Sequence, residues 1–465
     1  MAGLKHSFTW LLSLRLVLFD IITICACGVI STGLHGYSVF QSHIGPWDAL
    51  FVISSSLLCI DIIGGYEIRR DMCTLRYASE HLLAMCAVLV ISFITTYSLS
   101  SYNDAIKPGR TVLLLTIVLA TPVSLTYRYC FSHGAARAAA THFFYVLGTQ
   151  ELASDLLAIC LKANFRYPLR YIAEQVESST DINAFALYNS KLSDLLRELL
   201  SQEQGLCEGI IVDLKARIIS PELLKLLLDV NLHSVPVYPV ESFIESFFYK
   251  VDLSHVNVSW AFDGTFKAYH HKSYGRIKSL IDVIIASILL LTLMPLLLSI
   301  ALIIKASDGG PAFFKQIRIG RFGKPFMVYK LRTMSVANEP SNQLYTQASD
   351  SRVTRIGYIL RLSHFDEFPQ LWNVIKGEMS IIGPRAEWIK LVERYKKEFP
   401  LYHLRQIVKP GITGWAQVNY GYGASLEDTL EKLQYDLYYV KHYSPHMDAS
   451  IVLKTVFTML SGSGR

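Results

Sequence analysis

Charged residues are scarce in this chain. Asp, Glu, Lys and Arg together make up 18% of its 465 residues, whereas hydrophobic residues make up 51%. The mean hydropathy is +0.32, which is high for a soluble protein and predicts membrane segments combined with polar domains. At this length two or three domains are expected, because one hydrophobic core does not grow to this size.

Paired cysteine motifs and nucleic-acid motifs are also missing. None of the eight cysteines forms a CxxC pair, so we interpret them as small buried hydrophobic residues in a reducing compartment, not as metal ligands or disulfides. The net charge is +6, but no basic helix carries interleaved base-stacking aromatics. The positive charge therefore indicates an anionic membrane surface or phosphate substrates, and no nucleic acid is expected as a partner.

Four apolar stretches occupy the first third of the chain and predict a four-helix transmembrane domain at 1–135. Each is near the roughly 20 residues that cross the hydrocarbon core, and the first lacks the cleavage pattern of a signal peptide. The second loop carries Arg69, Arg70 and Arg76, whereas the first loop has no Lys or Arg. This asymmetry predicts that the N-terminus and everything after the fourth stretch are cytoplasmic. The stretches lie at 10–32, 47–64, 82–99 and 111–129.

Three charged residues, Arg15, Asp20 and Asp61, fall inside these stretches. Charges within a membrane are functional by default, but an ion pair between Arg15 and Asp20, or between helices, would serve packing equally well. Transport is disfavoured because the four spans contain no internal repeat.

Alternating strand and helix patterns at 140–260 predict a Rossmann-like α/β domain with a parallel sheet. Strands are expected at 143–147, 169–173, 209–214 and 234–238, and helices at 151–162, 191–201 and 221–230. The turn after the first strand has one glycine, Gly148, where a dinucleotide fingerprint has three. A structural or regulatory role is therefore favoured over nucleotide binding.

The segment 283–304 is long and apolar enough to cross the membrane, but two features favour a re-entrant helix at 280–305. Both flanks are basic, which the positive-inside rule assigns to the cytoplasm. Pro295 lies in the middle of the segment, where it removes a helix hydrogen bond and bends the axis. The basic residues nearest the segment are Lys267, Lys272, Arg276 and Lys278 before it, and Lys305, Lys315, Arg318, Arg321 and Lys324 after it.

Asp366 and Glu367 are adjacent acids in the stretch from Arg361 to Arg385. On a solvated turn such a pair needs no special explanation. Here Phe365 and Phe368 would hold the turn against a core, and Lys and Arg residues surround it. Carboxylates among basic residues suit a metal ion together with phosphates.

With these motifs the C-terminal part of the chain, from Arg276 onward, resembles the monotopic phosphoglycosyl transferases. These bacterial sugar transferases begin exopolysaccharide or O-antigen repeat units on polyprenyl phosphate, and the four-helix and Rossmann-like parts look like their large subgroup. Phe365, Phe368 and Tyr420 depart from the family pattern. The matching motifs are KSLID at 278–282, GGPAFFKQ at 309–316, GRFGKPF at 320–326, YKLRTM at 329–334, RVTRIG at 352–357, the Asp366-Glu367 stretch, and KPGITGWAQVN at 409–419.

The resemblance implies a mainly α catalytic domain at 274–465 that transfers a sugar phosphate from a UDP-sugar to polyprenyl (undecaprenyl) phosphate and releases UMP. Asp366 would be the nucleophile of a covalent intermediate, and Glu367 would bind Mg²⁺. Lys330, Arg332, Arg361 and Arg385 would hold the phosphates, although each is alternatively a solvated or lipid-headgroup contact.

The expected setting is the bacterial inner membrane, with the catalytic domain at its cytoplasmic face and a homodimer as the expected assembly. Two alternatives remain open at this point. One is a polytopic transferase that uses a ternary complex, and the other is a non-catalytic membrane scaffold of polysaccharide assembly. The sugar is not identified.

Overall fold

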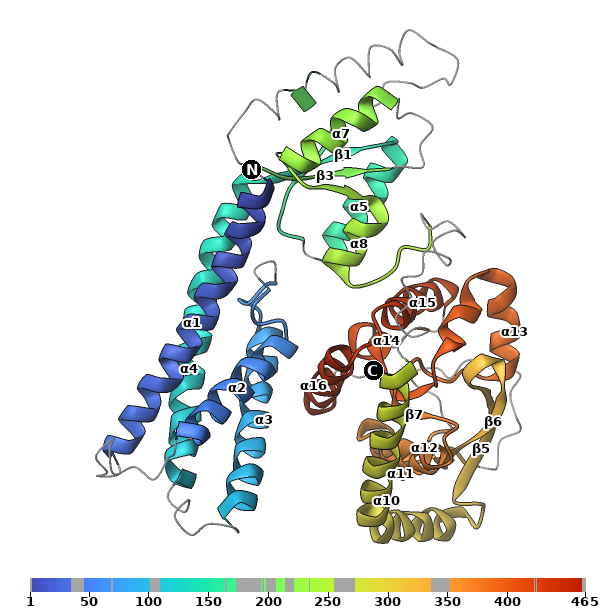
Figure 1. The fold of residues 1–465 in the computed structure, drawn as a ribbon. Coiled ribbons are helices and arrows are strands. Elements are labelled where there is room, and N and C mark those ends of the chain that lie inside the picture. Colours follow the sequence, from blue (N-terminus) through green and yellow to red (C-terminus); the bar gives the residue numbers. More distant parts are fainter. Residues whose placement is uncertain are drawn as a thin grey trace. The chain divides into compact units, whose positions relative to one another are not determined.

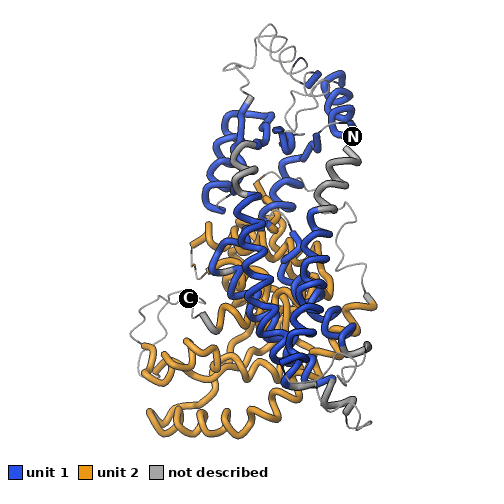
Figure 2. The backbone as a smooth tube through the Cα atoms, turned by 90° about the vertical axis from the view of Figure 1, so that its left-hand side faces the viewer, with its two compact units in different colours: residues 1–248 blue, residues 249–465 orange. Residues whose placement is uncertain are grey.

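The computed structural model separates into two compact units, Met1–Phe248 and Tyr249–Arg465 (Figure 2). We refer to them as the N-terminal and C-terminal units. The described residues are 2–34, 46–67, 70–100, 109–163, 165–172, 194, 196–197, 206–213, 221–233, 235–254, 272–335, 352–421, 423 and 425–461. Lys267 and most of the helix predicted at 191–201 lie outside these residues.

Four apolar helices begin the N-terminal unit, each at a predicted stretch. Three contain segments long and apolar enough to cross a membrane, namely Leu12–Leu34, Tyr77–Thr95 and Thr111–Ala135. The second helix is apolar but shorter, at Ala49–Ile62. The prediction of a membrane protein with N-terminal spanning helices is confirmed at this level. The helices are α1 (Ala2–Leu34), α2 (Pro46–Ile62), α3 (Leu75–Ser100) and α4 (Gly109–Thr141).

A buried ion pair joins α1 to α4. Nη2 of Arg128 lies 2.5 Å from Oδ2 of Asp20, and both side chains are almost fully buried. Ser124 and Tyr66 donate further hydrogen bonds to this carboxylate, at 2.8 and 2.9 Å. A buried charge requires such compensation, so Asp20 serves packing between helices and its partner is not Arg15.

A four-stranded sheet follows, which includes β1 and β3 (Figure 1). All of its strand pairs are parallel, and the strand order is β2-β1-β3-β4. Alternation along β1 explains how helices cover both faces. Phe144 and Val146 pack against α5 and α8, whereas Phe143 and Leu147 pack against α7. The strands are β1 (Phe143–Leu147), β2 (Leu169–Ile172), β3 (Cys207–Val212) and β4 (Val237–Pro239); the helices are α5 (Gln150–Lys162), α7 (Pro221–His233) and α8 (Val240–Phe248).

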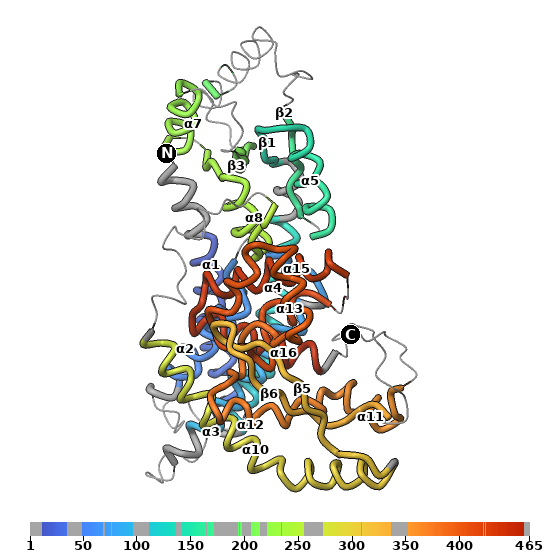
Figure 3. Tube along the Cα trace, turned by 90° about the vertical axis from the view of Figure 1, so that its right-hand side faces the viewer, coloured from blue at the N-terminus to red at the C-terminus, as the bar shows by residue number. Residues whose placement is uncertain are grey.

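The C-terminal unit contains a long apolar helix, α10 (Lys272–Asp308), which includes Pro295. The helix is sharply bent into two limbs (Figures 1 and 3), as expected for an internal proline. Ala286 on the first limb packs against α12 (Leu371–Ile375). Leu297 and Ile304 on the second limb pack against α11 (Arg355–Leu362) and β6 (Pro325–Leu331). The remaining outer face is apolar and exposed, and α10 is the fourth helix long and apolar enough to cross a membrane.

Two small sheets and short helices complete this unit. Strands β5 and β6 form an antiparallel hairpin, and β7 and β8 pair in parallel. The largest core lies among α13, η5, α14, α15 and α16. The elements are β5 (Phe313–Ile319), η3 (Arg321–Gly323), β6 (Pro325–Leu331), α11 (Arg355–Leu362), η4 (Phe365–Gln370), α12 (Leu371–Ile375), β7 (Ser380–Ile382), α13 (Ile389–Glu398), η5 (Tyr402–Ile407), β8 (Gly411–Thr413), α14 (Trp415–Asn419), α15 (Leu426–Lys441) and α16 (Pro445–Ser461).

Candidate active site

The two adjacent acids lie on the 3₁₀ turn η4. His364 precedes the turn with a φ of 56°, a left-handed conformation that few non-glycine residues adopt. The rings of Phe365 and Phe368 stack at 4.8 Å between centroids and pack against α10 and its neighbours. The expectation that these aromatic residues hold the turn against a core is therefore confirmed.

Glu367 is held by two cations from distant parts of the chain. Its Oε1 lies 2.5 Å from Nζ of Lys330 on β6 and 3.0 Å from Nη2 of Arg385, which follows β7. The side chain of Glu367 is only 12% exposed. Burial alone would raise the pKa of this carboxyl, but Arg385 and Lys330 outweigh that effect and hold its pKa far below the usual range. Glu367 is therefore ionised at neutral pH.

Asp366 has a different environment from its neighbour. Burial raises the pKa of this carboxyl and the charge of Glu367 adds to the rise, while Lys330, Arg385 and Arg361 oppose it. Across the described part of the chain, no side-chain hydrogen bond or ion pair engages the carboxylate of Asp366. One acid of the pair is thus fixed by cations, while the other has a raised pKa and is close enough to feel their charge.

The other two predicted phosphate-binding residues have different contacts from each other. Arg361, in the last turn of α11, donates from Nε to Oγ1 of Thr333 at 2.9 Å, and its charge acts on Asp366. Arg332 is buried, and its Nη2 donates to the carbonyl oxygen of Ile304 near the end of α10, at 3.4 Å. Arg361 thus belongs to the surroundings of Asp366, and Arg332 connects β6 to the second limb of α10.

Three residues that the sequence did not single out support the cluster. Arg318 on β5 donates to the carbonyl of Ala386 at 2.5 Å, and its guanidinium acts electrostatically on Arg385. Buried Arg405 donates to the carbonyl of Arg385 at 2.9 Å and pairs with Asp436 at 2.6 Å. These contacts join residues between 20 and 68 positions apart, so sequence spacing gave no signal for them.

Asn373 of α12 supports the strand that carries Lys330. Its Nδ2 donates to the carbonyl of Met327 at 2.6 Å and to Oε2 of Glu378 at 2.7 Å. Its Oδ1 accepts from the backbone N–H of Tyr329, the residue before Lys330, at 3.4 Å. Asn373 is fully buried, so it fixes β6 beside the turn that carries the two acids.

The donor set at this site fits magnesium bound together with a phosphate substrate. Within the described ranges, no group of three or more His, Cys, Asp or Glu side chains forms a metal cage. Mg²⁺ is often held by only one or two carboxylates plus substrate phosphates and water. Both cation contacts of Glu367 use Oε1, so a metal would bind this residue through Oε2.

Comparisons with known proteins concern mainly the C-terminal unit. The bacterial sugar transferase family matches residues 273–462. A UDP-N-acetylgalactosamine-undecaprenyl-phosphate N-acetylgalactosaminephosphotransferase of Aeromonas hydrophila is 37% identical over 257 residues, which cover 55% of this chain and 60% of that protein. A UDP-glucose:undecaprenyl-phosphate glucose-1-phosphate transferase of Escherichia coli is 44% identical over 182 residues, 38% of each chain.

A shorter relative is matched almost completely. The exopolysaccharide production protein PSS of Rhizobium leguminosarum is 39% identical over 191 residues, which cover 40% of this chain and 96% of that protein. By contrast, this chain spans less than two thirds of the length of the Aeromonas and Escherichia relatives. The chain belongs to the bacterial sugar transferase family.

Proposed function

We propose that this protein transfers a sugar-1-phosphate from a UDP-sugar to polyprenyl (undecaprenyl) phosphate and releases UMP. The reaction would be the first membrane step of exopolysaccharide or O-antigen biosynthesis. Family membership and the names of the relatives support the reaction class. The observation that carries the proposal is the contrast between Asp366, which makes no side-chain bond in the described part of the chain, and Glu367, which is fixed by Lys330 and Arg385.

The proposed chemistry has two steps at one phosphorus atom. A carboxylate oxygen of Asp366 attacks the sugar-bound phosphorus, the bond from that phosphorus to the bridging oxygen breaks, and UMP leaves with the bonding electrons. A phosphate oxygen of the polyprenyl phosphate then attacks the same phosphorus and releases the Asp366 carboxylate. The raised pKa of Asp366 supports this role, because a more basic carboxylate is a better nucleophile.

The cations near the turn would bind and orient the phosphates. Arg385 and Arg361 offer planar donors that suit phosphate oxygens, while Lys330 contributes a point charge. We propose the same role for Arg332, which follows β6 and donates to the carbonyl oxygen of Ile304 on α10. Glu367 would keep Lys330 and Arg385 in place and hold Mg²⁺. When bound, the ion would offset charge on the diphosphate.

We propose that α10 enters and leaves the same face of the membrane, with its re-entrant part at 280–305. The bend and the basic flanks support this topology. The catalytic domain at 274–465 would then lie on the cytoplasmic face of the bacterial inner membrane, with lipid contacting the exposed apolar face of α10. There it would have access both to UDP-sugars and to the phosphate of a lipid.

The N-terminal parts would have supporting roles. We propose a four-helix transmembrane domain at 1–135 and a Rossmann-like domain at 140–260, the latter supported by the parallel sheet with helices on both faces. We expect a homodimer. Light scattering in detergent would measure the molar mass of the protein and so test this oligomeric state.

Radiolabel transfer from a panel of UDP-sugars to undecaprenyl phosphate tests the reaction. We expect Asp366→Asn to lower turnover by at least about 10³-fold, because the amide is not a nucleophile at phosphorus. Asp155→Asn, on an exposed position of α5, is the matched control and should retain wild-type turnover. Wild-type turnover in Asp366→Asn would reject the nucleophile, and normal polysaccharide assembly in cells without transferase activity would favour the scaffold alternative.

A further inference from the structure

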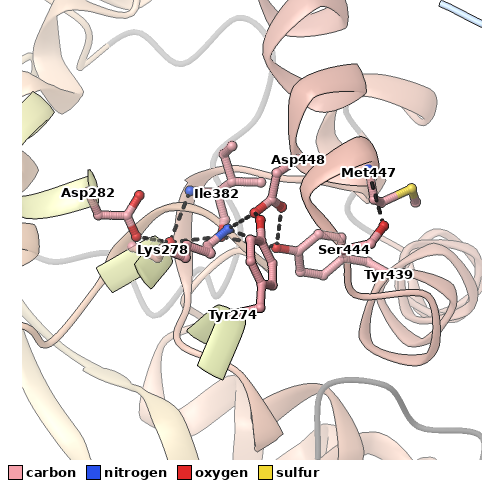
Figure 4. A network of polar contacts seen from close by, with 9 residues as sticks. Tyr274, Lys278, Asp282, Ile382, Tyr439, Ser444, Met447 and Asp448 are labelled. Carbon is pink, nitrogen blue, oxygen red and sulfur yellow. Dashed lines mark hydrogen bonds and ion pairs between the residues drawn. The ribbon is translucent and has the colours of Figure 1, made fainter. Parts of the chain in front are cut away.

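A buried polar network joins the beginning of α10 to the strand that precedes Arg385 (Figure 4). Lys278 and Asp282 lie four residues apart on α10 and therefore share one helix face. Both are buried, at 7% and 6% exposure. Because a buried charge is costly without partners, the contacts of these two side chains fix where the helix can sit.

Asp282 binds strand β7 directly. The hydroxyl of Ser380 donates to Oδ2 of Asp282 at 2.6 Å, and the backbone N–H of Ile381 also donates to this carboxylate. Ser380 is 2% exposed. The side chain of one residue on α10 thus contacts two consecutive residues of the strand.

Lys278 is connected to the same strand indirectly, through Asp448 and Tyr439. Its Nζ lies 2.5 Å from Oδ2 of Asp448 on α16 and 3.1 Å from the hydroxyl of Tyr439 on α15. That hydroxyl lies 2.7 Å from Oδ1 of Asp448 and 3.3 Å from the carbonyl oxygen of Ile382. Tyr274, also on α10, donates to Asp448 at 2.5 Å. Two residues of β7 are therefore held directly by Asp282 of α10, and the hydroxyl of Tyr439 lies beside the third.

The backbone between β7 and Arg385 has little freedom to move. The N–H of Gly383 donates to the carbonyl of Thr413 at 2.9 Å, and the N–H of Gly411 donates to the carbonyl of Pro384 at 3.0 Å. A Cβ atom on Gly383 would lie 2.3 Å from the carbonyl oxygen of Lys409. Because residues 383–384 pack this closely against residues 409–413, the backbone between Ser380 and Arg385 cannot absorb a displacement by bending. A displacement of Ser380 would therefore also move Arg385.

We propose that Asp282 is a positioning residue for Arg385. By holding Ser380 and Ile381, it aligns the arginine that contacts Glu367 at 3.0 Å, so the seating of α10 in the membrane and the alignment of this arginine are coupled. The proposal rests on the proposed function, in which Arg385 binds substrate phosphate.

Hydrogen exchange and transfer kinetics of the full-length protein in lipid nanodiscs test the proposal together. We expect Asp282→Ala to increase amide exchange in the peptide 380–388 and to lower kcat/KM by about 10- to 100-fold, the size expected when a reacting group is displaced by about 1 Å. Asp282→Asn keeps an oxygen that accepts from Ser380 and should recover most of both readouts. In an Arg385→Lys background, Asp282→Ala should lower kcat/KM by less than about threefold. The effect is smaller because Asp282 acts through Arg385, so the two substitutions are not additive.

Ser380→Ala removes the donor to Asp282 with a smaller change, and it carries the test if Asp282→Ala does not fold. Its matched control is Ser299→Ala on α10, whose hydroxyl donates to the carbonyl of Pro295 in its own helix. Wild-type exchange and kinetics in both Asp282→Ala and Ser380→Ala, or an undiminished penalty in the Arg385→Lys background, would overturn the proposal. Absence of transfer from every UDP-sugar would instead reject the proposed function, while the exchange data would still test the coupling.

Discussion

At the scale of single residues, neighbouring acids differ because their surroundings differ. Glu367 points toward Lys330 and Arg385, and these cations keep it ionised despite burial. Asp366 is one position away, but burial dominates and raises its pKa. Opposite shifts in two adjacent carboxyls are a pattern found where two acids have different tasks.

Glu367→Gln tests the role of the fixed acid. The amide keeps the shape of the side chain but leaves Lys330 and Arg385 without a balancing negative charge, so both cations should lose their alignment. We expect kcat/KM to fall by about 10²-fold or more, since charge-assisted hydrogen bonds to a buried group are lost. Steady-state kinetics measure the effect, with Glu398→Gln on an exposed position of α13 as the control. Equal kinetics in the two variants would contradict the role.

Asp436 predicts how stability depends on pH. Burial raises the pKa of this carboxyl to about 6, although Arg405 opposes the rise. The folded state therefore binds this proton more tightly than the unfolded chain, in which Asp titrates near 3.9. The stability contributed by protonated Asp436 is fully present below about pH 4 and is lost as the pH rises to about 6.

Thermal unfolding in detergent between pH 4 and pH 7 measures this dependence. We expect the Tm of the wild type, relative to that of Asp436→Asn, to decline across the interval from pH 4 to pH 6 and to stay level above it. The amide variant is the reference because its side chain does not titrate. A constant difference in Tm across the whole range would show that Asp436 does not titrate there.

At the scale of elements, α10 combines an apolar outer face with a polar beginning. On its first limb, Lys278 and Asp282 are buried and contact other elements of the C-terminal unit. Its second limb packs through Leu297 and Ile304 against α11 and β6. Pro295 lies inside this helix. In the proposed re-entrant topology, this proline would mark the place where the helix turns back.

Cysteine accessibility tests the topology of α10. In a cysteine-free background, we expect single cysteines at Ser273 and Lys324 to react with a membrane-impermeant maleimide from the cytoplasmic side only. Both positions are exposed in the structure. Pro295→Leu should straighten the helix and give a fraction of molecules with Lys324→Cys on the other side. If cysteines at Ser273 and Lys324 were labelled from opposite sides in the protein that keeps Pro295, the helix would cross the membrane.

At the scale of the whole molecule, the site lies entirely in the C-terminal unit. Asp366, Glu367 and the cations around them all belong to residues 249–465. The Rhizobium relative is almost completely covered by 191 residues, so a family member of that length lacks counterparts of most of the N-terminal unit. The parallel sheet and the N-terminal helices lie outside residues 273–462, the part that the family matches.

We expect a fragment of residues 249–465 to insert into membranes and to keep transfer activity within about tenfold of the full chain. The fragment begins at Tyr249 because Val251 belongs to the core of the C-terminal unit, and Lys250 pairs with Glu431 at 3.0 Å. Radiolabel transfer measures this, with the Asp366→Asn fragment as the blank. A folded but inactive fragment would show that the N-terminal unit takes part in the reaction.

The sequence by itself determined the features that depend on local pattern. Hydrophobic runs identified the membrane-type helices, the pattern of strands and helices identified β1 with the bounds that the structure has, and the order of motifs identified the family. These features follow from neighbours along the chain, since hydropathy and periodicity are local properties.

Only the tertiary structure decided which charges meet. It paired Asp20 with Arg128 across 108 positions, brought Lys330 and Arg385 to Glu367, and connected Arg385 to Arg405 and Asp282 to Ser380. No periodic pattern records such pairs, because each depends on how separate elements pack. The physical reason is the cost of burying an unpaired charge, which selects partners in space without regard to their distance in sequence.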